Sequence, residues 1–203
     1  MRIPFVPILL FADAGVPMIF LTFPAMVVLL LPIIALEAWI YRRLLPIDMK
    51  TAAKSSSIAN IASTIVGIPI AWGATLLFEF GLFWAITKFP GSDQLMNNWG
   101  RSPLMRVVGT ILASAWLGPD EKHIYWMIPL AVIVLMVPSF LISVWIEARI
   151  VDHIIDLPEA KSDNALSNPV RVAVWKANVV SYGLLIAGST AWLLIALLRP
   201  PSH

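Results

Sequence analysis

The sequence predicts an all-α integral membrane protein, a helical bundle of four transmembrane helices arranged as two tandem helical hairpins, with short interfacial helices. Of its 203 residues, 59% are hydrophobic and only 13% are charged, and the mean hydropathy is +0.84. Soluble domains are about 25% charged. Four apolar runs have the ~17–25 residues that a helix needs to cross a bilayer. Since a backbone in lipid must satisfy its own hydrogen bonds, these runs are expected to be helices.

The predicted elements follow one another along a single transmembrane domain, residues 1–203. We expect spans near residues 24–45, 58–86, 125–150 and 171–198. The corresponding segments are an N-terminal interfacial or re-entrant piece at 1–23, a first hairpin at 24–86, an external loop at 87–124 and a second hairpin at 125–198.

Breaks in the apolar pattern set apart the two segments that do not span. In residues 1–23, Pro4 and Pro7 interrupt the apolar stretch, which differs from a clean signal peptide, so we expect this piece to be retained. In the external loop, the apolar run from Leu104 to Leu117 is short for a span and contains Arg106. An interfacial helix is expected there.

Prolines inside the spans predict kinks. Pro32, Pro69 and Pro138 each lie within an apolar run. A proline lacks the backbone N–H and its ring presses on the preceding turn, but membrane helices tolerate it where neighbours satisfy the freed carbonyl. These spans are therefore expected to bend and not to end at the prolines.

The basic residues predict the orientation in the membrane. The connections between spans one and two and between spans three and four carry Arg42, Arg43, Lys50, Lys54, Arg149, Lys161, Arg171 and Lys176. Both connections are short, so the positive-inside rule places them in the cytoplasm. We expect a multi-pass protein of the bacterial inner (cytoplasmic) membrane with both termini outside.

Spans one and three share a pattern that predicts a tandem repeat. Pro32, Trp39 and Arg43 match Pro138, Trp145 and Arg149 at one constant offset. Spans two and four share a second pattern, in which Asn60 and Ser63 match Asn178 and Ser181 at a different offset, which an insertion or deletion in the intervening loop would explain. Two hairpins of the same topology indicate parallel repeats about an axis along the membrane normal.

Glu37 is the polar residue with the greatest functional interest, because it is a carboxylate inside the first span. An ionisable group at bilayer depth suggests a proton or cation site, or a buried pair. It also lies near one end of its span, where a side chain can reach the interface, so both readings stay open. In the repeat it has no acidic counterpart, because the matching position is Ser143. Glu79, near the outer end of span two, is expected at the interface.

Small and polar residues recur at helical spacing in spans two and four. Our candidate binding residues are Glu37, Asn60, Ser63, Asn178 and Ser181; Thr64, Gly67 and Ala71 share one face of span two with Asn60 and Ser63, and span four also has Gly183, Ala187 and Ala191 four apart. Small residues let membrane helices approach closely, and an asparagine can hydrogen-bond across the contact. These faces predict either helix packing or a polar path between the hairpins.

The sequence gives no support for an enzyme. The chain lacks cysteine, and His123, His153 and His203 are too scattered for metal ligation from one helix. Ser139 and Ser143 have no nearby base in the sequence, and no strands are evident. We therefore expect no catalytic residues, no metal, no cofactor and no nucleic-acid partner.

One stretch resembles a known family. Glu37-Ala38, Arg43-Leu44, Lys50-Thr51, Ala59 to Ser63 and Gly67 resemble a pattern in small bacterial integral membrane proteins, including the cyanobacterial filament-integrity proteins of the FraC type, which are associated with septa between cells. The resemblance spans about residues 37–67, and the four-span repeat departs from that smaller pattern. It implies a non-enzymatic membrane protein that works through partners, and it supplies no catalytic residues.

Two functions are therefore expected. The first is a non-enzymatic accessory or scaffold protein, in contact with lipid and with other membrane subunits or copies of itself through helix–helix contacts. The alternative is a small transporter or channel, with a polar path at the repeat interface that involves Glu37. A water-accessible cavity that reaches Glu37 favours transport, and dry packing around it favours a scaffold.

Overall fold

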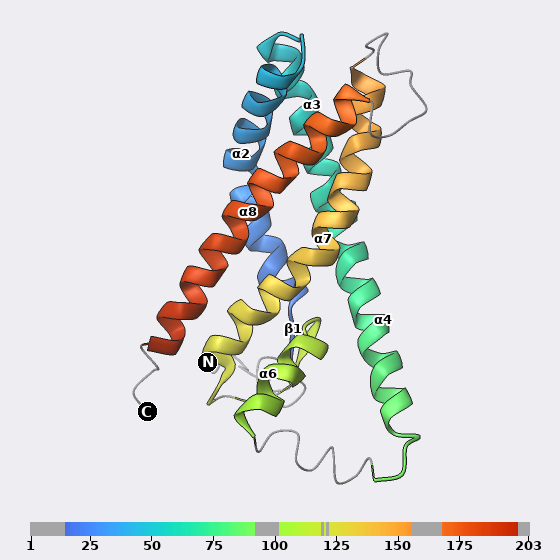
Figure 1. Ribbon diagram of the computed structural model, residues 1–203, viewed down its shortest axis with the longest axis vertical. Coiled ribbons are helices and arrows are strands. Elements are labelled where there is room, and N and C mark those ends of the chain that lie inside the picture. Colours follow the sequence, from blue (N-terminus) through green and yellow to red (C-terminus); the bar gives the residue numbers. More distant parts are fainter. Residues whose placement is uncertain (1–14, 92–101, 119, 121, 156–167, 199–203) are drawn as a thin grey trace, which may run out of the picture. The chain divides into compact units, whose positions relative to one another are not determined.

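The computed structural model of the protein describes residues 15–91, 102–118, 120, 122–155 and 168–198. Within this part, four helical stretches are long and apolar enough to span a membrane: Ile19–Leu44, Met49–Ile86, Ile124–Ile154 and Pro169–Leu198 (Figure 1). The predicted all-α bundle with four spans is confirmed. By the length and composition of these helices, the chain is a multi-pass membrane protein.

Three of the stretches are single helices, and one is composite. The single helices are α2 (Ile19–Leu44), α7 (Ile124–Ile154) and α8 (Pro169–Leu198). The second stretch comprises α3 (Met49–Ala62), the π-helical turn η1 (Ser63–Gly67) and α4 (Ile68–Ile86). Helix α2 begins before the expected start of the first span at residue 24. Pro24 lies inside the helix without interrupting it, because a proline removes only one hydrogen bond from the helical ladder.

The chain forms two compact units. Unit 1 contains residues Met1–Leu21, Trp72–Leu135 and Gly188–His203, and unit 2 contains Thr22–Ala71 and Met136–Ala187. Each of the four spanning stretches contributes residues to both units. The prediction of a single transmembrane domain stays a prediction.

Unit 2 is built from α3, η1 and the adjoining parts of α2, α7 and α8 (Figure 1). Its apolar core is rich in alanine and valine and includes Ala38, Tyr41, Ala52, Ala59, Val151, Val170, Ala173, Val174 and Ala177. Small side chains at the contacts let helices approach closely in a membrane, where packing and hydrogen bonds replace the hydrophobic effect between helices. The four helices can therefore bring polar side chains within hydrogen-bonding distance.

The turn between α2 and α3 is set by proline and an acidic cap. Pro46 follows Leu45 directly, and a residue before proline is disfavoured in the helical conformation. Oδ1 of Asp48 then accepts a hydrogen bond of 3.2 Å from the backbone N–H of Thr51, which satisfies a free donor of the first turn. Hydrogen bonds from Thr51 lower the pKa of Asp48 below its ordinary value.

The π-helical turn η1 lies directly before Pro69. The backbone N–H of Ile68 bonds the carbonyl of Ser63, five residues earlier, so the helix is locally widened. Pro69 cannot donate to the carbonyl of residue 65, and its ring crowds that carbonyl. A widened turn relieves this crowding. The structure thus places a specific irregularity at one of the three expected proline sites, and Ser63 and Thr64 lie within it.

The first turn of α8 is tied to the end of α7. Oδ1 of Asn168 accepts bonds from the backbone N–H groups of Val170 and Arg171, at 2.9 and 3.2 Å. Nδ2 of Asn168 donates to Asp152 at 3.0 Å, and the guanidinium of Arg171 forms an ion pair with the same carboxylate at 3.3 Å. Pro169 occupies the first helical position, where its missing N–H does no harm.

Unit 1 contains a small strand pair that the sequence did not predict. Val16–Pro17 (β1) pairs antiparallel with Trp116–Leu117 (β2), and the short apolar helix α6 (Pro103–Leu112) ends before β2. The expected helix at 104–117 is therefore shorter, and the expectation that the chain has no strands is wrong. Gly15 has φ +85°, and a side chain there would collide with the carbonyl of Leu117, so the approach to β1 requires glycine.

The expectation that Glu79 lies at the interface stays a prediction, and the structure adds hydrogen-bond partners for this residue. This carboxylate of α4 is buried, and its Oε2 accepts a hydrogen bond of 3.3 Å from the backbone N–H of Trp116. Nearby in unit 1, the indole of Trp72 donates to the carbonyl of Ala115 at 2.9 Å. Two side chains of α4 thus satisfy the backbone around β2, which explains why an acidic residue is retained inside unit 1.

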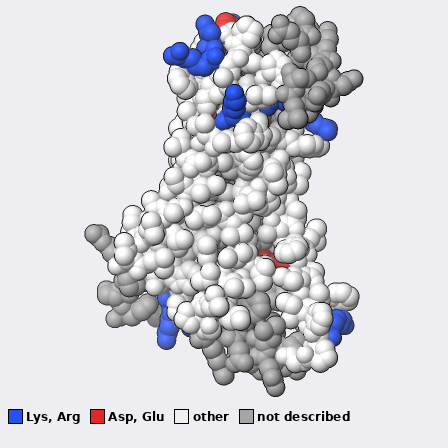
Figure 2. Space-filling view, viewed as in Figure 1, with Lys and Arg blue, Asp and Glu red and all other residues white. Residues whose placement is uncertain are grey.

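The surface of unit 2 is basic at the end that contains the α2–α3 turn. Lys and Arg atoms gather there, and smaller groups of Lys and Arg atoms lie elsewhere in the view shown (Figure 2). Arg42, Arg43, Lys50 and Lys54 are exposed. Of the predicted N-terminal piece at residues 1–23, residues 1–14 lie outside the described residues; in the rest, Val16–Pro17 forms β1 and the residues from Ile19 onward belong to α2.

Candidate functional site: two buried glutamates in unit 2

Two glutamates are buried among the helices of unit 2. Glu37 in α2 is 1% exposed, and Glu147 in α7 is 2% exposed. Each lies about two helical turns before the end of its helix. The expectation that Glu37 could reach the interface by extending its side chain is therefore wrong, since this side chain is enclosed by protein.

Hydrogen bonds hold both oxygens of Glu37. Nδ2 of Asn60, in α3, donates to Oε2 of Glu37 at 2.6 Å. The hydroxyl of Ser181, in α8, donates to Oε1 at 2.7 Å. Helices α2, α3 and α8 therefore meet at one carboxylate.

Glu147 has the same kinds of partner. Nδ2 of Asn178, in α8, donates to Oε2 of Glu147 at 2.7 Å. The hydroxyl of Ser63, in η1, donates to Oε1 at 2.6 Å. Each glutamate thus binds the asparagine of its own predicted hairpin and the serine of the other predicted hairpin. The two sets of contacts are therefore equivalent.

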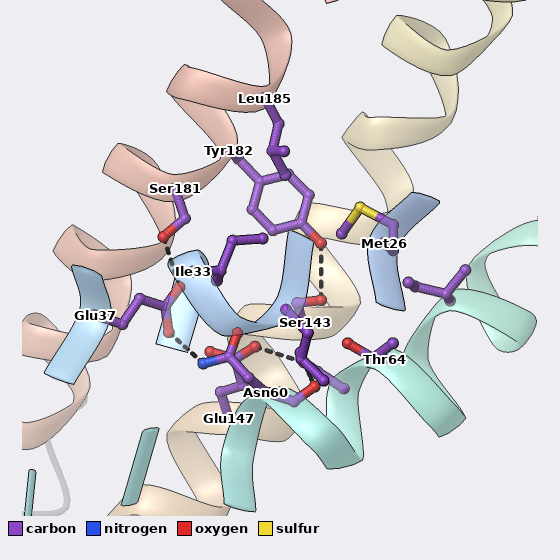
Figure 3. Close-up of a pocket in the computed structure, with 13 residues that line it drawn as sticks. Met26, Ile33, Glu37, Asn60, Thr64, Ser143, Glu147, Ser181, Tyr182 and Leu185 are labelled. Carbon is purple, nitrogen blue, oxygen red and sulfur yellow. Dashed lines mark hydrogen bonds between the residues drawn. The ribbon is translucent and has the colours of Figure 1, made fainter. Parts of the chain in front are cut away.

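The two glutamates and the serines line a small cavity. In Figure 3 the Glu37 and Glu147 side chains extend toward the same space, with Asn60 close to both. The lining residues are Met26, Leu30, Ile33, Glu37, Asn60, Ser63, Thr64, Ile68, Ser143, Glu147, Ser181, Tyr182 and Leu185. Measured as the space open to the centre of a water molecule, the cavity is about 10 Å³, close to the lower limit for holding one water.

A second polar pair, Ser143 and Tyr182, lies beside the apolar residues that line the cavity. The hydroxyls of Ser143 (α7) and Tyr182 (α8) lie 2.9 Å apart (Figure 3). The ring of Tyr182 packs edge-on against Phe140, with 5.3 Å between ring centroids. This packing fixes the phenol, so its hydroxyl stays directed at Ser143.

No cation in the described part of the chain forms an ion pair with either glutamate. Two arginines near the ends of the same helices have other contacts: the guanidinium of Arg43 stacks over Trp39 at 5.3 Å, and that of Arg149 over Trp145 at 4.2 Å. Both tryptophans are largely exposed. The site is therefore a pair of carboxyl groups that only neutral donors stabilise.

All five residues singled out from the sequence lie in this network: Glu37, Asn60, Ser63, Asn178 and Ser181. Glu147 was not predicted from the sequence. The repeat alignment pairs Glu37 with Ser143, and Glu147 lies one helical turn later, where the first hairpin has Tyr41. The signal was available, since Glu147 is also a carboxylate inside an apolar run.

The two small-residue faces have different surroundings. Gly67 is buried, and a methyl group added there would lie 3.2 Å from Cδ1 of Ile146 in α7, which confirms close packing on this face. A methyl group added at Gly183 would meet nothing within 4 Å, and Ala187 and Ala191 are exposed. The face of α8 that contains these three residues is therefore open.

Within the described residues, no group of three or more His, Asp or Glu side chains is placed to hold a metal ion. Comparison of the chain with protein families, with curated proteins and with solved structures finds no match. The site itself is therefore the basis for a functional proposal.

Proposed function

We propose that the protein is a small membrane transporter or channel that moves protons or small cations through the Glu37–Glu147 site. The observation that carries this proposal is the burial of two carboxyl groups, inside predicted spans, beside one small cavity and without a cationic partner among the described residues. Ionisable residues inside spans are costly, and they commonly mark ion pathways and proton relays.

The chemistry of the site limits the substrate. Carboxylate and hydroxyl oxygens bind protons and hard cations, and the site offers no cationic group for an anion. A cavity close to the size of one water has no room for a metabolite. Protons and small inorganic cations therefore fit this site best.

Ion flux in vesicles tests the proposal. The wild-type protein is reconstituted into liposomes that contain a pH-sensitive dye, and proton entry is followed after a pH step, with and without a sodium gradient. We expect flux above that of protein-free liposomes, and a loss of at least ten-fold in Glu37→Gln and in Glu147→Gln. The matched control is Glu79→Gln, which alters a buried glutamate outside the cavity and should keep wild-type flux. Equal flux in all four proteins would reject the proposal.

A second candidate function is that of an accessory or scaffold protein. The open face of α8, with Gly183, Ala187 and Ala191, favours it, because small residues let another membrane helix approach. The resemblance to FraC-type proteins also supports work through partners. Co-purification from native membranes would test it: Gly183→Leu should lose a partner subunit that Gly73→Leu retains, since Gly73 also has open surroundings but lies on a different helix.

A tandem repeat accounts for the reciprocal contacts of the site. The cation–π pairs Trp39–Arg43 and Trp145–Arg149, and the Asn–Ser pairs of α3–η1 and α8, occur once in each predicted hairpin. Internal repeats place ion sites at their interface in many transporters. We include in the proposal that the two hairpins arose by duplication, and that the site lies between them.

The orientation is part of the same proposal. We place the protein in the bacterial cytoplasmic membrane with the α2–α3 turn in the cytoplasm, because four exposed basic residues surround that turn. The chain has no cysteine, so Lys50→Cys creates a unique thiol. In intact cells this thiol should resist a membrane-impermeant maleimide and should react after lysis. Full reaction in intact cells would reverse the orientation.

A further inference from the structure

The hydrogen bonds at the site determine which oxygen atoms are able to bind a proton. The inference drawn from them rests on the proposed function and specifies it further. We propose that Glu37 and Glu147 are proton-binding groups, each holding its proton on Oε1, with Ser181 and Ser63 as switching hydroxyls that accommodate it. The position of the proton depends on which hydrogen-bonding groups can donate, which can accept, and which are free to exchange these roles.

The asparagines are fixed as donors. Nδ2 of Asn60 lies 2.6 Å from Oε2 of Glu37 and 3.0 Å from the carbonyl of Ser56. A backbone carbonyl only accepts, so turning the amide around would set oxygen against oxygen. Nδ2 of Asn178 is held in the same way between Glu147 and the carbonyl of Val174, at 2.7 and 3.2 Å. A proton on Oε2 of either glutamate would compete with the N–H group that faces this oxygen, so Oε1, which faces a hydroxyl able to accept, is the favoured position.

The serines are not fixed. The single hydroxyl hydrogen of Ser181 has two acceptors, Oε1 of Glu37 at 2.7 Å and the carbonyl of Ala177 at 3.0 Å. That of Ser63 also has two acceptors, Oε1 of Glu147 at 2.6 Å and the carbonyl of Asn60 at 3.2 Å. One hydrogen cannot bond both acceptors fully, so each serine hydroxyl has two possible orientations, one toward each acceptor.

The two arrangements match the two states of the carboxyl group. When Glu37 is ionised, Ser181 donates to Oε1. When a proton binds, an O–H bond forms at Oε1 and donates to Oγ of Ser181, while the serine hydrogen turns to the carbonyl of Ala177. The serine keeps its own O–H bond throughout, and the proton comes from a hydronium ion of the aqueous phase, which is left as a water. Ser63 serves Glu147 in the same way.

The surroundings favour proton uptake over permanent charge. An isolated ionised carboxylate is costly to bury, and neutralisation by a proton is the usual outcome. The other titratable side chains near the two glutamates are Tyr41 on α2 and Tyr182 on α8, and both are neutral phenols in their ordinary state. Two buried polar atoms near the glutamates, Oδ1 of Asn178 and the hydroxyl of Tyr41, have no hydrogen-bond partner among the described residues. No cation of those residues pairs with either glutamate, so the uncharged, protonated form of the carboxyl groups is favoured.

Infrared spectroscopy of the protein in lipid vesicles tests this inference without any transport. We expect a carbonyl band from protonated carboxylic acid that shifts in D2O and that loses intensity in Glu37→Gln and in Glu147→Gln. In Ser181→Ala the Glu37 component should move to higher frequency, because its O–H loses the acceptor, and Ser181→Thr should restore it. Ser55→Ala, on the same helix as Asn60 and with a hydroxyl that has no partner, should leave the band unchanged.

Two results would overturn the inference: a protonated-acid band that neither glutamine variant diminishes, or a Glu37 component that is identical in the wild type and Ser181→Ala. If Ser181→Ala does not remain monodisperse, comparison of the wild type with the two glutamine variants still shows whether the glutamates give the protonated-acid band. The role of the serine is then tested at Glu147 with Ser63→Ala. The outcome is also separable from the proposed function. Bands as expected without vesicle flux would mean that the glutamates bind protons but do not move them across the membrane.

Discussion

Ser181 donates a hydrogen bond of 2.7 Å to Glu37, although the two residues are 144 positions apart in the chain. The bond joins α8 to α2, and its counterpart from Ser63 joins η1 to Glu147 in α7. Each glutamate is thus held by one residue of its own predicted hairpin and one of the other. The network therefore ties together all four helices of unit 2.

Truncation of Glu37 should destabilise the protein more than its conversion to glutamine. Glu37→Ala leaves one N–H of the buried Asn60 amide without its acceptor, at about 1–3 kcal/mol for an unsatisfied group, whereas Ser181 can still donate to the carbonyl of Ala177. Glu37→Gln presents a carbonyl to Asn60 and an amide N–H to Oγ of Ser181, as the protonated acid would. We expect its free energy of unfolding in detergent to stay within about 1 kcal/mol of the wild-type value. Equal losses in the two variants would show that the folded site requires an ionised carboxylate.

A larger side chain at position 67 should separate η1 from α7. In Gly67→Val the added methyl groups meet Ile146, whose Cδ1 is already 3.2 Å from the position of a Cβ. Overpacking of this kind lowers stability by about 1–3 kcal/mol. Gly73→Val is the control, since nothing lies within 4 Å of its Cβ position. Thermal unfolding in detergent should show a lower midpoint for Gly67→Val than for Gly73→Val, and identical midpoints would contradict close packing of η1 against α7.

Acid should loosen the start of α3 through Asp48. The pKa of Asp48 is lowered by the hydrogen bonds from Thr51. The ionised side chain therefore contributes its full stabilisation when the pH is above the ordinary pKa of 3.8. This stabilisation is lost as the pH falls through the lower pKa of the folded state. Amide hydrogen exchange at Thr51 should therefore accelerate at the acid end of that range. Asp48→Asn, which does not titrate, should show no such step. A step at the same pH in both proteins would assign it to another group.

Much of the fold could be predicted from the sequence, because the apolar runs are long and lipid leaves the backbone no alternative to helix. The membrane helices, the buried face that contains Asn60, Ser63 and Gly67, and the interest of Glu37 follow from composition and spacing. The strand pair β1–β2 could not be predicted, since each strand has two residues and forms only through contacts between distant segments.

The partner of Glu37 was hidden by a shift of one helical turn. Strict alignment of the repeats pairs Glu37 with Ser143 and Tyr41 with Glu147, whereas the hydrogen bonds pair the two glutamates as equivalents. Positions four apart share a helix face, so a carboxylate can move by one turn and still reach the same cavity. A search for acidic residues on one face, and not at one alignment position, would have found Glu147.

The reciprocal bonds between the glutamates and the serines hold the site together, and a double-mutant cycle measures them most directly. The free energy of unfolding is determined in detergent for Glu37→Ala, Ser181→Ala and the double variant, and a second cycle combines Glu37→Ala with Ser55→Ala. We predict a coupling of about 0.5–2 kcal/mol between Glu37 and Ser181, and none between Glu37 and Ser55. Additive losses in both cycles would contradict a direct bond between Glu37 and Ser181.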